Sequence, residues 1–104
     1  MERIAFKMTL FKGAEEEYAR RHRELWPELE QLLRKTGITD YSICLDTDTN
    51  LLFASLKVPD RKLLDALAGE PVMQRWWQYM KDLMASHADG SPVTTPLKEV
   101  FYLP

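Results

Sequence analysis

The sequence predicts an α+β fold in which two helical regions alternate with strands. Alternating apolar residues, the pattern of a β-strand, lie near the start of the chain and in its middle, and two further apolar segments, in the middle and at the end, also predict strands. Two longer segments repeat their apolar residues every three or four positions, which is typical of an amphipathic helix. The resulting order, βαββαβ, is the ferredoxin-like arrangement, an antiparallel sheet with helices on one face.

The first half of the chain is predicted to form a strand and a broken helix. The strand covers residues 3–11, and a run of glutamates beginning at Glu15 then opens the helix, where the helix dipole favours carboxylates. Pro27 cannot lie inside one helix because it lacks a backbone N–H and clashes with the preceding turn. We therefore expect a break at residues 25–26, a second helical piece from Pro27, and an end at Gly37.

The second half begins with a predicted hairpin. Residues 38–46 alternate, residues 51–58 are predicted to form the next strand, and the sequence DTDTN between them is typical of a turn. The remaining elements are a helix in two pieces, an irregular loop and a last strand, predicted at residues 60–68, 70–84, 85–96 and 97–103.

The composition indicates one domain over residues 1–104 and argues against several classes of protein. The net charge of −2 provides no basic excess for a phosphate backbone, so we expect no nucleic-acid partner. The N-terminus lacks the apolar core of a signal peptide, and no apolar run reaches the roughly 18 residues that span a membrane. A single cysteine, Cys44, excludes an internal disulfide and fits a reducing compartment, so we expect a soluble cytoplasmic protein.

Apolar residues lie on both faces of the predicted sheet, although the helices cover only one of them. An uncovered apolar face is a liability in a monomer, because it promotes association. We therefore expect a homodimer, in which the two sheets face each other.

Tyr18 and His22 are the first candidates for chemistry. They are four residues apart, so on a helix they share one face with the apolar stripe of Leu25, Leu29 and Leu32. An imidazole gives and takes protons near neutral pH, and a phenol binds hydroxyl-rich ligands. Spacing alone favours the alternative, in which His22 is a core histidine hydrogen-bonded to a neighbour and Tyr18 only contributes to core packing.

Two adjacent tryptophans, Trp76 and Trp77, are the second candidate. Neighbouring residues on a helix point about 100° apart, so the two indoles cannot fill the same part of the core. An indole is a flat apolar plate with one N–H donor, which suits the mixed surface of a sugar. A large contact between helix and sheet explains the pair equally well on the sequence alone.

The sequence contains no ligand pattern for a metal. Residues 46–50 resemble the start of a calcium loop, but Leu51 replaces the turn glycine and Lys57 replaces the bidentate glutamate. The two histidines, His22 and His87, are far apart and follow no ligand spacing. We therefore expect no bound metal.

Taken together, these segments resemble the L-rhamnose mutarotase family. The resemblance rests on EEEYARRHRELWPELE, on DYSICLDTDTNLLFA, on QRWWQYMKDLM and on the closing SPV…LKEVFYLP. It runs from the first strand to the last residue without a sizeable insertion, although residues 57–68 contribute little. The motifs are specific in combination, and none of them is specific alone.

The resemblance implies a homodimer without a cofactor, a dimeric α/β-barrel in which two ferredoxin-like protomers join their sheets. It also implies interconversion of the α and β anomers of L-rhamnose in the cytoplasm. His22 matches the proton-donating residue of the family. Its sugar-contacting positions match Tyr18, Tyr41, Trp76 and Trp77 in this sequence.

Mutarotation opens and recloses a hemiacetal ring, which needs proton transfer at the ring oxygen and the anomeric hydroxyl but no metal or redox centre. We expect His22 to protonate the ring oxygen, Tyr18 to hold or relay a proton, and Tyr41 to donate a hydrogen bond from its strand. One of the tryptophans is expected to stack on the sugar. The complementary base stays open between Tyr18, a water molecule and a carboxylate brought in by folding.

Two alternatives to a mutarotase stay open. Small dimeric α/β-barrel proteins also include oxygenases and haem-handling proteins, and a helical histidine beside tryptophans could be a functional residue in such a protein. The other alternative is a non-catalytic sugar-binding dimer, with Tyr18 and His22 in the core.

Overall fold

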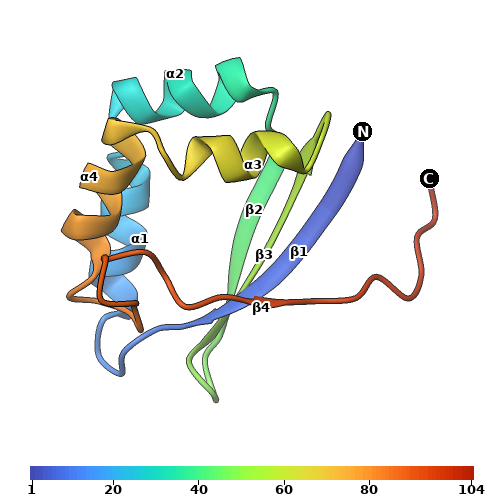
Figure 1. The fold of residues 1–104 in the computed structure, drawn as a ribbon. Coiled ribbons are helices and arrows are strands. Elements are labelled where there is room, and N and C mark those ends of the chain that lie inside the picture. Colours follow the sequence, from blue (N-terminus) through green and yellow to red (C-terminus); the bar gives the residue numbers. More distant parts are fainter.

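The computed structural model of the protein describes residues 1–104 in the order βαββαβ, with each helical region in two pieces (Figure 1). The strands are β1 (Glu2–Thr9), β2 (Thr39–Asp46), β3 (Leu51–Val58) and β4 (Thr95–Pro96). The helices are α1 (Glu15–Arg23), α2 (Pro27–Thr36), α3 (Lys62–Leu67) and α4 (Pro71–Met80). The predicted α+β class is confirmed. None of these helices has the length and apolar character needed to cross a membrane.

The four strands form one antiparallel sheet in the order β2-β3-β1-β4. This is the ferredoxin-like order, in which the two central strands come from opposite halves of the fold. The pairing of β1 with β3 is continuous, from Glu2 opposite Val58 to Thr9 opposite Leu51. Figure 1 shows the helices on one side of the sheet and the C-terminal segment on the other, so one face of the sheet has no helical cover.

The core lies between the helices and the sheet. Side chains alternate along a strand, and in β3 every second residue is buried, with Leu56 the most exposed of them at only 5%. Their buried partners on β1 and the helices are Met8, Tyr18, Leu29, Leu67, Trp76 and Met80. The remaining residues of β3 face the uncovered side.

Pro27 divides the first helical region at the predicted place. The preceding residue, Trp26, is extended (φ −60°, ψ 130°), as the steric demand of a following proline favours, and Pro27 opens α2. Gly37 ends α2 with a φ of 92°, and a Cβ atom there would lie 2.8 Å from the ring of Pro59. Both the backbone angle and the close approach therefore require glycine at this position.

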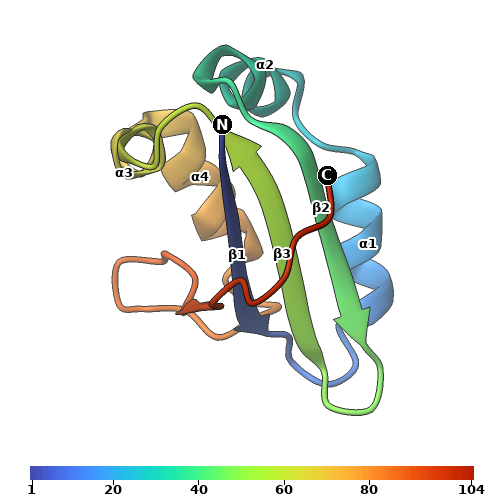
Figure 2. The same cartoon turned by 90° about the vertical axis from the view of Figure 1, so that its right-hand side faces the viewer.

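The predicted last strand over residues 97–103 is wrong, because only the two residues of β4 pair with β1. Beyond β4, the chain is held by Arg3. Its guanidinium group donates two hydrogen bonds of 2.8 Å to Glu99 and lies 3.1 Å from the ring centre of Tyr102. Figure 2 shows this segment in front of the uncovered face. The segment beyond β4 therefore lies against the uncovered face and does not extend the ladder between β4 and β1.

α4 also ends before the predicted position, at Met80. The helix ends here because the residues that follow it form hydrogen bonds with residues 9–11, at the end of β1. The N–H of Phe11 donates to the carbonyl of Leu83 at 2.8 Å, and the N–H of Ala85 donates to the carbonyl of Thr9 at 3.0 Å. These bonds bring the segment after α4 against the end of β1.

Candidate functional site

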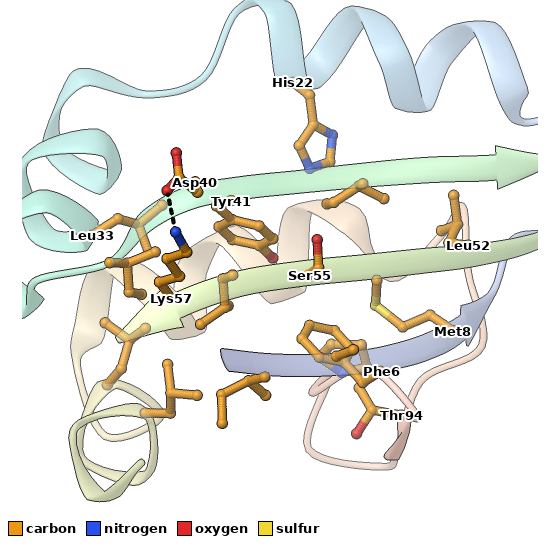
Figure 3. Close-up of a pocket in the computed structure, with 18 of the residues that line it drawn as sticks. Phe6, Met8, His22, Leu33, Asp40, Tyr41, Leu52, Ser55, Lys57 and Thr94 are labelled. Atoms are coloured by element: carbon orange, nitrogen blue, oxygen red, sulfur yellow. Dashed lines mark ion pairs between the residues drawn. The ribbon is translucent and has the colours of Figure 1, made fainter. Parts of the chain in front are cut away.

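α1 presents Tyr18 and His22 to the sheet. Tyr18 is only 8% exposed, His22 is half-buried, and their ring centres lie 4.4 Å apart. This contact follows from the spacing of four residues, which places one side chain above the other on a helix. Figure 3 shows the His22 ring pointing from its helix toward the sheet. The predicted shared inward face is therefore confirmed.

α4 contributes Trp76 and Trp77. Trp76 is 5% exposed, and its ring meets His22 at 5.4 Å and Trp26 at 5.1 Å, edge to face in both cases. Trp77 is half-buried. Trp76 is thus locked between two other rings, whereas Trp77 keeps more of its surface free to meet a ligand.

Tyr41 enters the same region from β2. It is 40% exposed, and partial removal of its phenol from water raises the pKa of Tyr41 to about 12. The pKa of Tyr18 is also raised, mainly by its own burial and to a lesser extent by the nearby Tyr41 phenol. Both tyrosines line the same cavity.

All five predicted site residues line one cavity of about 70 Å³. Its other walls are mainly methionines and residues of the segment after α4, namely Met8, Ile43, Met73, Met80, Met84, Ser86, Gly90 and Pro92. The five residues also border an open groove of about 1680 Å³, which extends to Ser55 and Glu99 on the uncovered side of the sheet. The cavity is thus mainly apolar, with a few polar groups from α1, β2, α4 and the segment after α4, and its five site residues also border the open groove.

Sequence reasoning did not identify the contribution of Met8, Met84, Ser86, Gly90 and Pro92. Met73 and Met80 belong to the apolar stripe of α4 and could have been found from its period. Met8 lies on the alternating inward face of β1 and could also have been found from its period. Met84, Ser86, Gly90 and Pro92 carry no local signal, because only the bonds between the end of β1 and the segment after α4 bring them to the cavity.

The tautomer of His22 follows from its one hydrogen bond. Nδ1 lies 3.0 Å from the carbonyl oxygen of Tyr18, and a carbonyl oxygen can only accept, so Nδ1 carries the hydrogen. In the neutral ring Nε2 therefore keeps its lone pair, and Nε2 makes no hydrogen bond to the protein. Burial lowers the pKa of His22 more than this hydrogen bond raises it. At neutral pH, the site accordingly holds an uncharged imidazole with a free acceptor nitrogen.

Arg21 connects the two helices that carry the site. Its side chain is 11% exposed and donates to Asp82 at 2.9 Å and 3.2 Å and to Glu17 at 2.7 Å. Its guanidinium carbon also lies 4.3 Å from the ring centre of Tyr79. Because Arg21 precedes His22 and Tyr79 follows the tryptophan pair, these contacts set the distance between the α1 and α4 walls.

The polar groups on the cavity wall are few. They are the imidazole of His22 and the hydroxyl groups of Tyr18, Tyr41 and Ser86, together with the tryptophan N–H groups. No carboxylate lines the cavity, and no three side chains of the metal-binding types come together anywhere in the structure. Glu15, Asp40 and Glu99 border only the larger open groove, and the choice of a complementary base between Tyr18, a water molecule and a carboxylate stays a prediction.

Comparison with known proteins assigns this chain to one family. The family described as L-rhamnose mutarotase matches residues 3–103. The chain belongs to the L-rhamnose mutarotase family. The resemblance inferred from the four sequence motifs is thereby confirmed.

Relatives in the L-rhamnose mutarotase family match along the whole chain. The protein is 53% identical over 104 residues to the L-rhamnose mutarotase of Burkholderia ambifaria, with 100% of both chains covered. It is 50% identical over 103 residues to that of Brucella anthropi, with 99% and 97% of the two chains covered. The crystal structure of L-rhamnose mutarotase from Formosa agariphila matches with a TM-score of 0.92 and 47% identity over 100% of both chains.

Proposed function

We propose that this protein is an isomerase that interconverts the α and β anomers of L-rhamnose. The observation that carries the proposal is the uncharged His22, whose free Nε2 belongs to a cavity lined by two phenols and two indoles. Its relatives are named for this activity. An imidazole with a pKa near or below neutrality suits a reaction that only moves protons.

Ring opening transfers one proton from the anomeric hydroxyl to the ring oxygen. The neutral His22 first accepts the anomeric proton at Nε2 while the bond between C1 and the ring oxygen breaks. The resulting imidazolium then donates that proton to the ring oxygen, the role that the resemblance implies for His22. Rotation about the bond between C1 and C2, followed by the reverse steps, produces the other anomer. A positioned acid–base group of this kind contributes about 10²–10⁴-fold to the rate.

The two tyrosines hold the sugar while His22 acts. Burial raises the pKa of both phenols, to about 12 for Tyr41, so both keep their hydrogens at neutral pH. Each is therefore a hydrogen-bond donor toward a sugar hydroxyl or the ring oxygen. Because the ring centres of Tyr18 and His22 are 4.4 Å apart, Tyr18 is the phenol suited to relay a proton.

The tryptophans have different tasks in this site. Trp77 is half-buried and stacks on the C–H face of the sugar, because part of its ring is free. Trp76 is fixed by His22 and Trp26 and shapes the wall against which the imidazole rests.

The same proposal includes a homodimer that forms a dimeric α/β-barrel, sheet against sheet. Phe53 on the uncovered face is 38% exposed, and Val100, Phe101 and Leu103 of the C-terminal segment are 87%, 78% and 79% exposed. So much exposed apolar surface on one side favours association. A second copy on this side would also close the groove that extends there from the cavity. Light scattering that gives the mass of a monomer at micromolar concentration would contradict the dimer.

We further propose that residues 1–104 act as one mutarotase domain in the cytoplasm and without a cofactor. Proton transfer at a hemiacetal requires neither a metal nor a redox group. The single cysteine, Cys44, is free and exposed, which suits a reducing compartment.

Saturation-transfer NMR between the anomeric protons of L-rhamnose tests the function. Added protein is expected to increase the exchange rate in proportion to its concentration, and His22→Ala is expected to lower this rate by about 10²–10⁴-fold. The proposal is wrong if the unaltered protein does not accelerate exchange. Binding of L-rhamnose without faster exchange would instead support a non-catalytic sugar-binding dimer.

A further inference from the structure

β2 contains a bulge directly before Tyr41. Thr39 pairs with Lys57 and Ser42 pairs with Ser55, so β2 has one residue more than β3 between these two pairs. A bulge of this kind redirects the side chains that follow it, and such bulges often lie beside active sites.

Two registers meet at this bulge, and they assign Tyr41 to opposite faces of the sheet. If the register before the bulge continued without the extra residue, Tyr41 would stand opposite Ser55, which faces the uncovered side. The extra residue shifts the register by one, so Ser42 takes that place and Tyr41 turns to the helix side. There Tyr41 lines the cavity together with His22.

Asp40 provides the backbone conformation at this bulge. Its φ is 49°, and Asn50 is the only other non-glycine residue with a positive φ, at 59°. Aspartate and asparagine adopt this left-handed region more readily than other side chains with a Cβ atom. Figure 3 shows the Asp40 carboxylate paired with Lys57, at 3.2 Å. This ion pair is exposed, so it contributes less to the bulge than the backbone conformation.

We propose that Asp40 is a positioning residue for the sugar site, because its left-handed backbone creates the bulge that holds Tyr41 in the cavity. This inference rests on the proposed function, in which Tyr41 donates a hydrogen bond to the sugar. Asp40 does not line the small cavity and acts only through its neighbour. A residue that resists positive φ would draw β2 toward the regular register and withdraw the Tyr41 hydroxyl group from the sugar.

Asp40→Val and Asp40→Gly test this role as a matched pair. Valine, branched at Cβ, resists the left-handed region, whereas glycine enters it freely. Asp40→Val is expected to raise the KM for L-rhamnose about tenfold, the effect of one lost hydrogen bond, and to change kcat much less. Asp40→Gly is expected to keep KM within about twofold of the unaltered value, because it preserves the bulge. Equal KM values for the two variants would overturn the proposal.

Tyr41→Phe shows whether the effect passes through Tyr41. This variant is expected to raise KM as Asp40→Val does, and the double variant should be scarcely worse than either single one, since all three lose the same hydrogen bond. If the increase in KM of the double variant equals the product of the two single increases, the positioning role is contradicted. If Tyr41→Phe leaves KM unchanged while the unaltered protein accelerates exchange, both the role of Tyr41 and that of Asp40 are wrong, although the mutarotase activity stands.

Asn50→Val is the control for general strain. It places the same unfavourable residue at a positive φ, but in the turn between β2 and β3, away from Tyr41. It is expected to lower the free energy of unfolding and to leave KM unchanged. An increase in KM as large as that of Asp40→Val would show that strain anywhere in the hairpin is sufficient, which would overturn the proposal.

Discussion

Nδ1 of His22 lies 3.0 Å from the carbonyl oxygen of Tyr18, one helical turn earlier in α1. In a regular helix a backbone carbonyl accepts one hydrogen bond, from a backbone N–H. The Tyr18 carbonyl also accepts a hydrogen bond from the imidazole, which orients the ring and fixes its tautomer. The free nitrogen, Nε2, is consequently the atom that meets a substrate. The backbone of α1 alone thus sets the tautomer in which Nε2 of His22 can accept a proton, and no other side chain is needed for this.

The pH dependence of activity follows from the state of His22. Burial lowers its pKa below the ordinary value of about 6.5, so the neutral form is the resting form at neutral pH. If catalysis starts by accepting the anomeric proton, kcat/KM should be constant above about pH 6.5 and fall only as the pH drops through the lowered pKa. NMR exchange rates over a pH series measure this profile. A rate that decreases as the pH rises through the pKa of His22 would show that the resting imidazole must be protonated. This result would contradict the proposed order of proton transfers.

His22→Asn separates the orienting nitrogen of His22 from the reacting one. The asparagine amide can still donate to the Tyr18 carbonyl from near the Nδ1 position, but it has no basic nitrogen at the Nε2 position. Activity is expected to fall by about 10²–10⁴-fold while the midpoint of urea unfolding stays close to that of the unaltered protein. Substantial activity in His22→Asn would exclude Nε2 as the proton carrier.

Alanine at the two tryptophans should have different consequences. Trp76 is 5% exposed and packed against two rings, so Trp76→Ala is expected to lower the free energy of unfolding by about 3–5 kcal/mol. Trp77→Ala should cost less stability but weaken L-rhamnose binding, and Trp77→Phe should restore part of the affinity because it restores an aromatic face. Urea unfolding and calorimetric titration measure the two effects. Unchanged affinity in Trp77→Ala would exclude stacking on Trp77.

Gly37 is expected to be the glycine least tolerant of a side chain at a helix end. Gly37→Ala combines a φ of 92° with a Cβ atom 2.8 Å from Pro59, and should lower the free energy of unfolding by about 1–3 kcal/mol. Gly69→Ala is the matched control, because Gly69 has no positive φ and its nearest neighbour would lie 3.5 Å away. Chemical denaturation should give similar free energies of unfolding for the unaltered protein and Gly69→Ala, and a lower one for Gly37→Ala. Equal stability of the two variants would contradict this reasoning.

Much of the fold was predictable because its causes are local. The missing N–H of Pro27 breaks the first helical region, and the alternation of β3 is visible in eight consecutive residues. The bulge in β2 was not predictable, since it is defined by the partner strand and not by the sequence around Asp40. The end of α4 at Met80 likewise depends on bonds to the end of β1.

The candidate site was predictable in part. Helical spacing placed Tyr18 and His22 on one inward face, but it favoured core over substrate, and only the resemblance of the whole chain to a family reversed that preference. Met84 and the loop residues of the cavity were not predictable, because nothing near them in the sequence says which distant segment they meet. Contact of each of the five residues with a sugar stays a prediction, which the variants of His22, Tyr41 and Trp77 test most directly.

The sequence by itself determined the order of the elements, the break at Pro27 and the inward face of Tyr18 and His22, because each depends on backbone sterics or on the period of one segment. The tertiary structure decided which segments pair and what surrounds each side chain. The apolar residues of segment 97–103 predict a strand, yet Arg3 holds this segment on the uncovered face through Glu99 and Tyr102. The burial that leaves His22 uncharged likewise arises from neighbours that are distant in the chain, so only the folded structure shows it.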